Sequence, residues 1–329
     1  MKNTPIIFCH YGNSKYLKYV FECVRISNPK KEIILLGDKS NKKVAQSCGV
    51  THFNLSDFDS SPDIEIFDKF YQLIETKSFD SVKHGEDWNK FVFRKWFILN
   101  NFLIQNKIEK FWHFDSDNMI FSDLLPFESL YSELDCTEQC EGNCMKGLFN
   151  NQEIIAKYVK KINEVFMCKK TMEQKSKEMA NLEGNACFNE MSVYGIFKKD
   201  EKFSAIRLNE IRDGASFDDL ICRSHGLKME KLPHGEDVKV VFFNPDGRFF
   251  CQEEESKKPV MMHALNLSWV PLYTFSETLK HFKKNHKKPH SAFDANSKTL
   301  SQVSIPLKQR FKKYRKYIRL KLKKMTKKK

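Results

Sequence analysis

The sequence predicts an α/β fold with a mostly parallel central sheet flanked by helices, followed by a basic helical tail. Strand-like apolar runs alternate with helical patterns over residues 5–53, which is the order of βαβ units. A further apolar strand is expected at residues 111–114, after a long amphipathic helix. The chain has 329 residues, of which 41% are hydrophobic, and this is enough to bury one α/β core or two small ones.

The first part of the pattern predicts three strands and two helices. Residues 5–9 are apolar and are followed by His-Tyr-Gly-Asn, so we expect a buried strand and a turn, with Ser14 capping the next helix. Further strands are expected at residues 32–36, before Gly-Asp, and at residues 50–53, after a second helix. This spacing indicates parallel strands with right-handed crossovers. The first loop lacks G-x-G-x-x-G, which argues against a Rossmann dinucleotide site.

The middle of the chain contains the strongest helical pattern. Residues 89–105 carry aromatic and aliphatic side chains at helical spacing, and residues 54–87 before them are polar and acidic, which predicts a loop with one helix. Residues 131–182 are expected to be mostly helical. Later strands are expected at residues 238–243 and 248–251, and residues 118–121 and 260–265 are further short apolar runs.

The net charge of +14 belongs to the C-terminal end. Residues 307–329 hold 13 of the 56 Lys and Arg residues and no acid, so the remainder is almost neutral. We expect one domain at residues 1–278 and a basic linker with an amphipathic tail at residues 279–329. Apolar residues recur at helical spacing in the tail, which favours peripheral contact of residues 307–329 with an anionic membrane. A solvated tail and an RNA-binding arm are the alternatives.

The cysteines and the start of the chain bear on the compartment. No apolar run reaches the ~18 residues that span a bilayer, and no secretory signal pattern is present. We therefore expect a cytoplasmic protein, with the inner membrane face as a place of peripheral contact. The ten cysteines are then reduced thiols. Cys136, Cys140 and Cys144 would share one face of a helix and could hold a soft metal, but unlinked thiols are the favoured interpretation.

Two acidic residues follow the predicted strand at residues 111–114. Asp115 and Asp117 stand one residue apart where the strand ends, and in open α/β sheets ligands bind beyond the carboxyl ends of strands. Carboxylate oxygens suit a hard divalent cation, which in turn neutralises charge on a departing diphosphate. We favour this interpretation over a simple capping turn.

These features together resemble the GT-A glycosyltransferases of bacteria and viruses. The resemblance rests on Ile-Ile-Phe-Cys-His-Tyr-Gly, Ile-Ile-Leu-Leu-Gly-Asp, the Arg-Lys-Trp-Phe helix and Phe-Trp-His-Phe-Asp-Ser-Asp, and it covers residues 5–125. It implies a GT-A-like domain that moves a sugar from a nucleoside-diphosphate donor to a glycan or lipid-linked acceptor, as in polysaccharide biosynthesis. It also implies that Asp115 and Asp117 bind Mn²⁺ or Mg²⁺ and the donor diphosphate.

The resemblance implies further ligands for the nucleotide and the metal. The first loop, with His10, Tyr11 and Gly12, and Asp38 after the second strand would contact the nucleotide. Arg94 would reach the sugar or diphosphate, although a solvated helix charge is the alternative.

The later half of the chain supplies the remaining candidates. His263 would complete the metal site, although a core histidine is the alternative. Glu190 is the preferred catalytic acid or base, with Asp246 as the second candidate. Trp269 could stack on a sugar or pack in the core.

Two other functions remain open at this point. A sugar nucleotidyltransferase uses similar metal carboxylates, but the Gly-rich N-terminal loop with Arg and Lys is missing. A non-enzymatic protein that binds membrane or RNA through its tail is the third possibility. Because the body is neutral, nucleic acid is not an expected partner of the main domain.

Overall fold

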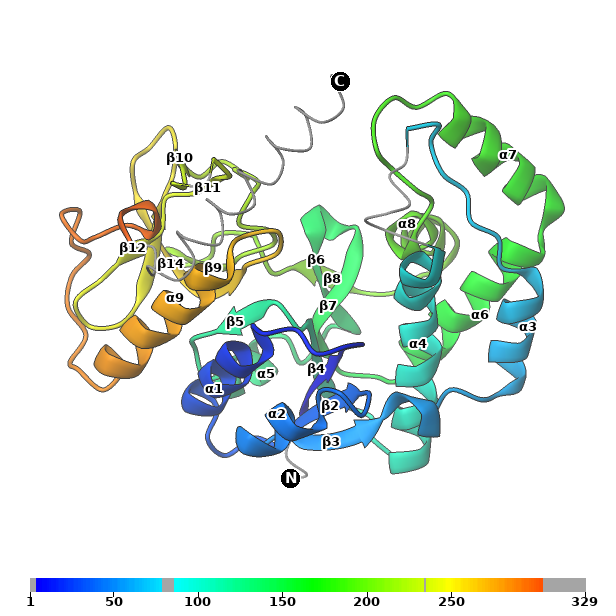
Figure 1. The fold of residues 1–329 in the computed structure, drawn as a ribbon, viewed down its shortest axis with the longest axis horizontal. Coiled ribbons are helices and arrows are strands. Elements are labelled where there is room, and N and C mark those ends of the chain that lie inside the picture. Colours follow the sequence, from blue (N-terminus) through cyan, green and yellow to red (C-terminus); the bar gives the residue numbers. More distant parts are fainter. Residues whose placement is uncertain (1–3, 79–85, 234, 304–329) are drawn as a thin grey trace, which may run out of the picture.

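The computed structural model describes residues 4–78, 86–233 and 235–303. Its centre is a sheet with the strand order β3-β2-β1-β4-β7-β6-β8, in which β1, β2, β3 and β4 pair in parallel (Figure 1). β7 runs antiparallel to both of its neighbours, and β8 pairs with β6 in parallel. The strands are β1 (Ile6–Cys9), β2 (Ile33–Gly37), β3 (Thr51–Asn54), β4 (Phe111–Asp115), β6 (Cys136–Gln139), β7 (Cys144–Phe149) and β8 (Ala205–Arg207). The predicted α/β class with a mostly parallel central sheet is confirmed.

Helices cover both faces of this sheet because its strands are apolar on both sides. Ile6 and Phe8 of β1 belong to one core and Ile7 and Cys9 to the other, which is the alternation of a pleated strand. The first core also contains side chains of α1 (Leu17–Ser27), α2 (Lys42–Ser47) and α9 (Leu272–Asn285). The second contains side chains of α3 (Pro62–Phe70), α4 (Glu86–Asn106), α6 (Glu153–Met167), α7 (Lys169–Ala180) and α8 (Glu190–Asp200).

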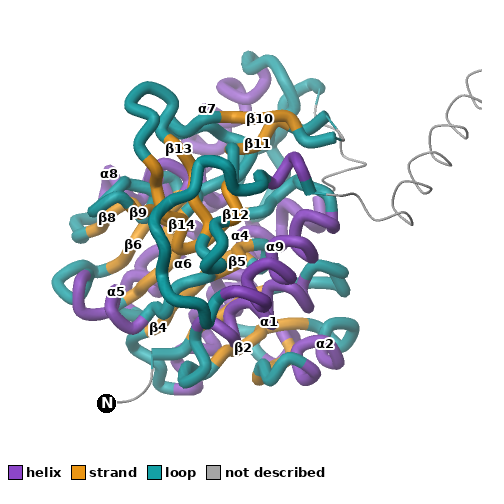
Figure 2. Tube along the Cα trace, turned by 90° about the vertical axis from the view of Figure 1, so that its left-hand side faces the viewer, coloured by secondary structure: helices purple, strands orange, loops and turns teal. Residues whose placement is uncertain are grey.

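A second sheet continues from the end of β4. β5 (Asn118–Ile120) pairs with β14 (Pro259–Asn266), which pairs with β13 (Phe249–Gln252), and β12 (Phe242–Phe243) forms the edge. β9 (Ala215–Phe217) joins β14, and β10 (Met229–Lys231) pairs separately with β11 (Asp237–Lys239). α1 packs against both α9 and β5, while α5 (Leu125–Leu130) follows β5 (Figure 2). The chain therefore crosses from one sheet to the other at residues 115–118.

Three local predictions are wrong. Residues 131–182 begin with β6 and β7 before α6 and α7, because all six residues of β7 are buried in the sheet. Cys136, Cys140 and Cys144 consequently lie on a strand, a 3-10 turn and a second strand, and do not share a helix face. Ser14 does not cap α1, which begins at Leu17; its hydroxyl contacts His10 instead.

The structured part of the chain reaches beyond the predicted domain boundary. The boundary between residues 278 and 279 falls inside α9, and residues 286–303 pack back on the second sheet. Thr299 forms a β-bridge with Phe242, and Leu300 is fully buried. The predicted amphipathic tail lies outside the described residues. No helix in the described part of the chain has the length and hydrophobicity that a membrane span needs.

Candidate active site

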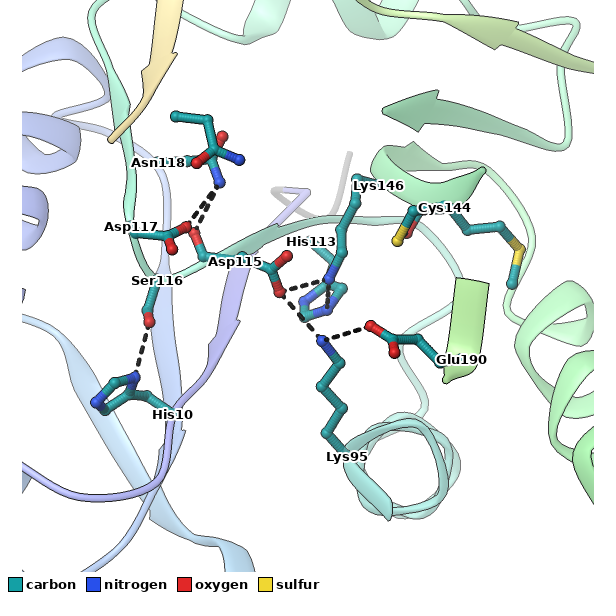
Figure 3. A network of polar contacts seen from close by, with 12 residues as sticks. His10, Lys95, His113, Asp115, Ser116, Asp117, Asn118, Cys144, Lys146 and Glu190 are labelled. Carbon is teal, nitrogen blue, oxygen red and sulfur yellow. Dashed lines mark hydrogen bonds and ion pairs between the residues drawn. The ribbon is translucent and has the colours of Figure 1, made fainter. Parts of the chain in front are cut away.

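The candidate site lies where β4 leaves the central sheet. Cys9 of β1 is in register with Asp115 of β4, so the loop after β1 and the segment Asp115-Ser116-Asp117 share one edge of the sheet. The end of β14 reaches the same edge, because the backbone N–H of Leu267 donates to the carbonyl oxygen of Asp117 over 3.1 Å. Both sheets therefore contribute to one cluster of polar side chains (Figure 3).

Two lysines converge on one carboxylate oxygen of Asp115. The Nζ atoms of Lys146 and Lys95 lie 2.7 and 3.2 Å from its Oδ1. The lysine side chains are only 2% and 9% exposed, whereas that of Asp115 is 41% exposed. Burial alone would raise the pKa of Asp115, but the two ammonium groups outweigh it and hold this pKa far below its usual range. Asp115 is therefore a permanent anion that opens toward solvent.

Both lysines lie in apolar surroundings, Lys95 on a helix and Lys146 on a buried strand. Lys95 follows Val92 by three residues and precedes Leu99 by four, so it lies on the buried face of α4. Lys146 precedes Gly147, whose φ is +95° and where a Cβ atom would collide with Thr137 and Leu208. A buried lysine needs an anionic partner, and Asp115 supplies it for both.

Lys146 also forms a hydrogen bond with His113. Nδ1 of His113 lies 3.0 Å from the carbonyl oxygen of Ile7, and its Nε2 lies 3.3 Å from Nζ of Lys146. Burial, together with Lys146, keeps the pKa of His113 well below its ordinary value, so the ring is neutral. Nδ1–H then donates to Ile7, and Nε2 accepts from Lys146. The imidazole thus fixes the ammonium group beside Asp115.

Glu190, a predicted catalytic residue, is brought to this cluster. It is the first residue of α8, whose N-terminus is capped by the side chain of Asn189, and its Oε1 lies 3.9 Å from Nζ of Lys95. Burial raises the pKa of Glu190. Lys95 therefore stands between two carboxylates, one from β4 and one from α8.

Asp117 faces the second sheet. Its Oδ2 accepts a hydrogen bond of 2.7 Å from the hydroxyl of Ser268. Burial and the neighbouring charge of Asp115 raise the pKa of Asp117 to about 6, which shows that negative charge at this position is incompletely balanced.

The donor set around Asp117 bears on the predicted metal. In the ranges that the structure describes, no three His, Cys, Asp or Glu side chains gather to hold a metal ion. Two carboxylates without a third protein ligand still suit Mg²⁺ or Mn²⁺, because such ions keep waters and take phosphate oxygens from a substrate. The raised pKa of Asp117 is in keeping with a position that a cation would stabilise.

The predicted nucleotide contacts lie together on the loop after β1. His10 contacts the hydroxyl of Ser116 over 2.8 Å, and burial lowers the pKa of this histidine to about 4. Gly12 donates its backbone N–H to Asp38, which also accepts from the backbone N–H of Ser40 over 2.6 Å. The Tyr11 side chain is 70% exposed, with its ring beside Phe91. This loop is therefore pinned to β2 and to the Asp-Ser-Asp segment.

Arg94 points away from the cluster. Its Nε lies 2.6 Å from Oδ1 of Asp59, and its Nη1 contacts Asp68 of α3. Arg94 lies one residue, or about 100° around α4, from Lys95. Arg94 thus has the anionic partner that was predicted, but this partner is Asp59 and Asp68 of the same chain. Lys95 is the residue of α4 that reaches the site.

His263 is likewise separated from the two aspartates. Its Nδ1 lies 2.8 Å from the hydroxyl of Ser122, and its ring packs on Phe127 and Phe217. Burial lowers its pKa to about 4. Asn266, not His263, is opposite Asn118 in the antiparallel pair, so the structure puts Ser268 beside Asp117 and His263 several residues away. His263 is a half-buried histidine that packs among aromatic side chains.

Asp246 lies in the turn between β12 and β13, at the far edge of the second sheet. Its carboxylate accepts from Asn244, from both the backbone and the side chain of Arg248, and from the backbone of Ser291. These bonds lower its pKa to about 2 despite burial. Asp246 holds this turn against residues 291–294 and is not part of the site.

No protein-family model and no curated protein matches the sequence. Among solved structures, the fold is similar to a cytidylyltransferase from Leptospira borgpetersenii, with 14% identity over 65% of this chain and 78% of that one, at a TM-score of 0.34. It is also similar to the PaToxG glycosyltransferase, with 10% identity, 60% and 70% coverage and a TM-score of 0.35. The glycosyltransferase GlyE of Streptococcus pneumoniae shares 17% identity, with 63% of this chain and 45% of that one covered, at a TM-score of 0.32.

Proposed function

We propose that the chain transfers a sugar from a nucleoside-diphosphate donor to a hydroxyl group of a glycan or lipid-linked acceptor. The observation that carries this proposal is the cluster at the end of β4. There, Asp115 and Asp117 lie beside two buried lysines and one buried glutamate, Glu190. A diphosphate needs cations, a sugar needs acceptors and donors for its hydroxyls, and this cluster places both kinds of group side by side.

The nucleoside would bind over the ends of β1 and β2. The exposed ring of Tyr11 is available to stack on a base, and Asp38 is a partly exposed carboxylate that a ribose hydroxyl can reach. Gly12, with φ of +86° and nothing within 4 Å of an added Cβ atom, leaves room above the loop. His10 would keep Ser116, and with it the Asp-Ser-Asp segment, at a fixed distance from the nucleotide.

The diphosphate would lie between Asp117 and the two lysines. Asp115 and Asp117 would hold Mn²⁺ or Mg²⁺, and the ion would supply Lewis-acid stabilisation of the leaving nucleoside diphosphate. Lys146 and Lys95 lie on the opposite side of Asp115. Buried behind Asp115, they would hold its carboxylate in place and balance its charge while the ion contacts the diphosphate.

Glu190 would serve the acceptor. In the transfer, the bond from the anomeric carbon to the phosphate oxygen breaks, and a bond from the same carbon to the acceptor oxygen forms. The acceptor hydroxyl loses its proton, and the raised pKa of Glu190 makes its carboxylate a suitable recipient. Lys95, 3.9 Å away, would hold that carboxylate in position.

The test measures release of nucleotide from UDP-, GDP- and CMP-sugars with and without Mn²⁺. The Asp117→Asn variant is expected to lose at least tenfold in the metal-dependent rate, because one anionic ligand becomes neutral. Asp123→Asn is the matched control, since Asp123 is an exposed residue that accepts from the backbone N–H of Leu125 and an asparagine keeps that bond. Full activity of Asp117→Asn would refute the site.

A sugar nucleotidyltransferase is the alternative that the same assay separates. It would release pyrophosphate from a nucleoside triphosphate and a sugar phosphate, and would leave nucleotide-sugars intact. Detection of pyrophosphate would therefore replace our proposal, whereas nucleotide release from a sugar donor would support it.

A further inference from the structure

The hydroxyl group of Ser268 lies within hydrogen-bond distance of two acceptors. Its Oγ is 2.7 Å from Oδ2 of Asp117 and 2.5 Å from Oδ1 of Asn266. An ionised carboxylate and the carbonyl oxygen of an amide can only accept, and a serine hydroxyl carries a single proton. The hydroxyl therefore donates to one of these two oxygens at a time, although the distances suit both bonds.

The side-chain amide of Asn266 is held in one orientation. Asn266 is the last residue of β14, is 7% exposed, and donates from Nδ2 to the carbonyl oxygen of Asp219 over 2.8 Å. Its Oδ1 also accepts from the backbone N–H of Ser268 over 3.1 Å, which is the turn that an asparagine side chain forms with the backbone two residues on. Because Nδ2 is the group that can donate to Asp219, Oδ1 must face Ser268.

A buried ion pair fixes the backbone of Asn266. The N–H of Asn266 donates to Oδ2 of Asp218 over 3.0 Å, and the other carboxylate oxygen of Asp218 contacts Nζ of Lys239. Both side chains of this pair are at most 1% exposed. Such a pair is weak evidence for stability, because removing two charges from water offsets much of their attraction. Its direct consequence is a fixed strand end, which keeps the amide of Asn266 beside Ser268.

The asparagine turn alone does not account for the contact with the hydroxyl. A turn of this kind needs only the backbone N–H two residues on, so it would also form in a Ser268→Ala variant. The serine adds a proton that either Asn266 or Asp117 can accept. Asp117 is one of the two residues proposed to hold the cation, so the direction of this proton affects how well its carboxylate receives a positive ion.

We propose that Asn266 is a positioning residue that lets the Ser268 hydroxyl turn away from Asp117 when a divalent cation binds. Without the cation, the hydroxyl donates to the carboxylate. A proton directed at a carboxylate that holds a cation is repelled by the positive charge, and Oδ1 of Asn266 then accepts it. The hydroxyl thus keeps an acceptor in both states. This inference rests on the metal-dependent part of the proposed function.

The experiment is a double-mutant cycle in the full chain, with Mn²⁺ alone as the probe in a calorimetric titration. The variants are Asn266→Ala, Ser268→Ala and the combination of both. Asn266→Leu, which is closer to asparagine in size, repeats the first change without a large loss of volume. Asn163→Ala is the matched control, because Asn163 is also a buried asparagine whose Nδ2 donates to a backbone carbonyl, that of Asp63 over 3.0 Å, but lies on α6. Tm is measured for each variant.

We expect Asn266→Ala to weaken Mn²⁺ binding about tenfold, because the hydroxyl proton then has only Asp117 as its acceptor. In the Ser268→Ala background, the same change should alter the affinity less than about twofold, since no hydroxyl remains to be redirected. Asn266→Leu should behave as Asn266→Ala does. Asn163→Ala should lower the Tm and leave Mn²⁺ binding as in the wild type.

Additive losses for Asn266→Ala and Ser268→Ala would overturn the inference, because Asn266 would then act independently of the hydroxyl, as a structural residue. Unchanged Mn²⁺ binding of both Asn266 variants would overturn it as well. A wild type that binds no Mn²⁺ would refute the metal assignment and this inference with it. A wild type that binds Mn²⁺ but releases nucleotide from no sugar donor would refute the proposed transfer alone, and the cycle would still decide the role of Asn266.

Discussion

The ion pair between Lys146 and Asp115 can be tested by a double-mutant cycle. The variants are Lys146→Met, Asp115→Asn and the combination of both. The two groups are 2.7 Å apart, and the ammonium group is buried while the carboxylate is 41% exposed. A hydrogen bond to a charged group contributes ~1.5–3 kcal/mol to the free energy of unfolding. Partial exposure and the second partner, Lys95, reduce the expected coupling to about 1–2 kcal/mol.

Urea unfolding measures the free energy of unfolding for the wild type and the three variants. The double variant should cost about 1–2 kcal/mol less than the sum of the two single variants, because each single change already removes the ion pair. Lys146→Met also removes the N–H group that His113 accepts, while Asp115 keeps Lys95. The control cycle uses Lys231 and Asp237, a pair at 3.8 Å in which both side chains are about two-thirds exposed, and should give a coupling below ~0.5 kcal/mol. A coupling equally small for Lys146 and Asp115 would show that the buried lysine does not depend on this carboxylate.

Four further predictions follow, three from single contacts and one from the tail. The pKa of Asp246 is lowered to about 2, so its carboxylate should stabilise the fold by about 2 kcal/mol above pH 4. This contribution should vanish as the pH falls through 2. Urea unfolding of the wild type and of Asp246→Asn, at pH 6 and at lower pH, checks the difference. Ser268→Ala should weaken Mn²⁺ binding about tenfold, because Asp117 loses a hydrogen bond that favours its anionic form. His263→Ala should leave Mn²⁺ binding unchanged in the same calorimetric titration, and a loss there would return His263 to the metal site. Removal of residues 304–329 should abolish binding to vesicles with anionic lipid while nucleotide release persists; equal vesicle binding with and without the tail would refute the membrane role.

The periodicity of α4 predicts both the helix and the buried position of Lys95. The helix itself follows from its aromatic and aliphatic spacing, and the structure has it at Glu86–Asn106. The same spacing puts Lys95 in line with Val92 and Leu99 on the buried side, and Arg94 one step around. A charged residue on the apolar face of a helix indicates a buried ionic site more strongly than a charged residue next to that face. The helical spacing therefore favours Lys95 as the residue that reaches the site, whereas the resemblance to a family favours Arg94.

Lys146 was harder to find from the sequence. β6 and β7 are four and six residues long and are separated by a 3-10 turn, so neither has the length that a period of two needs to stand out. Their stability comes from burial between the two cores, which is a tertiary effect. One signal was nonetheless present. Lys146 is the one ionisable amine in Cys144–Phe149, and a lysine inside such an apolar run requires a buried anion nearby.

The metal end of the site depends on strand register, which no local pattern encodes. Asp115 and Asp117 could be predicted because they end a recognisable strand, whereas Glu190 was predicted from the resemblance to a family. The partner of Asp117 depends instead on how β14 aligns with β5. Antiparallel pairing of Asn266 with Asn118 brings Ser268, the second residue after the strand, to the aspartate, while each step back along β14 moves a side chain ~3.4 Å away. A histidine five residues earlier than Ser268 thus lies beside Ser122 and Phe127, at the far end of β5, and the group that contacts Asp117 is a hydroxyl that donates to it.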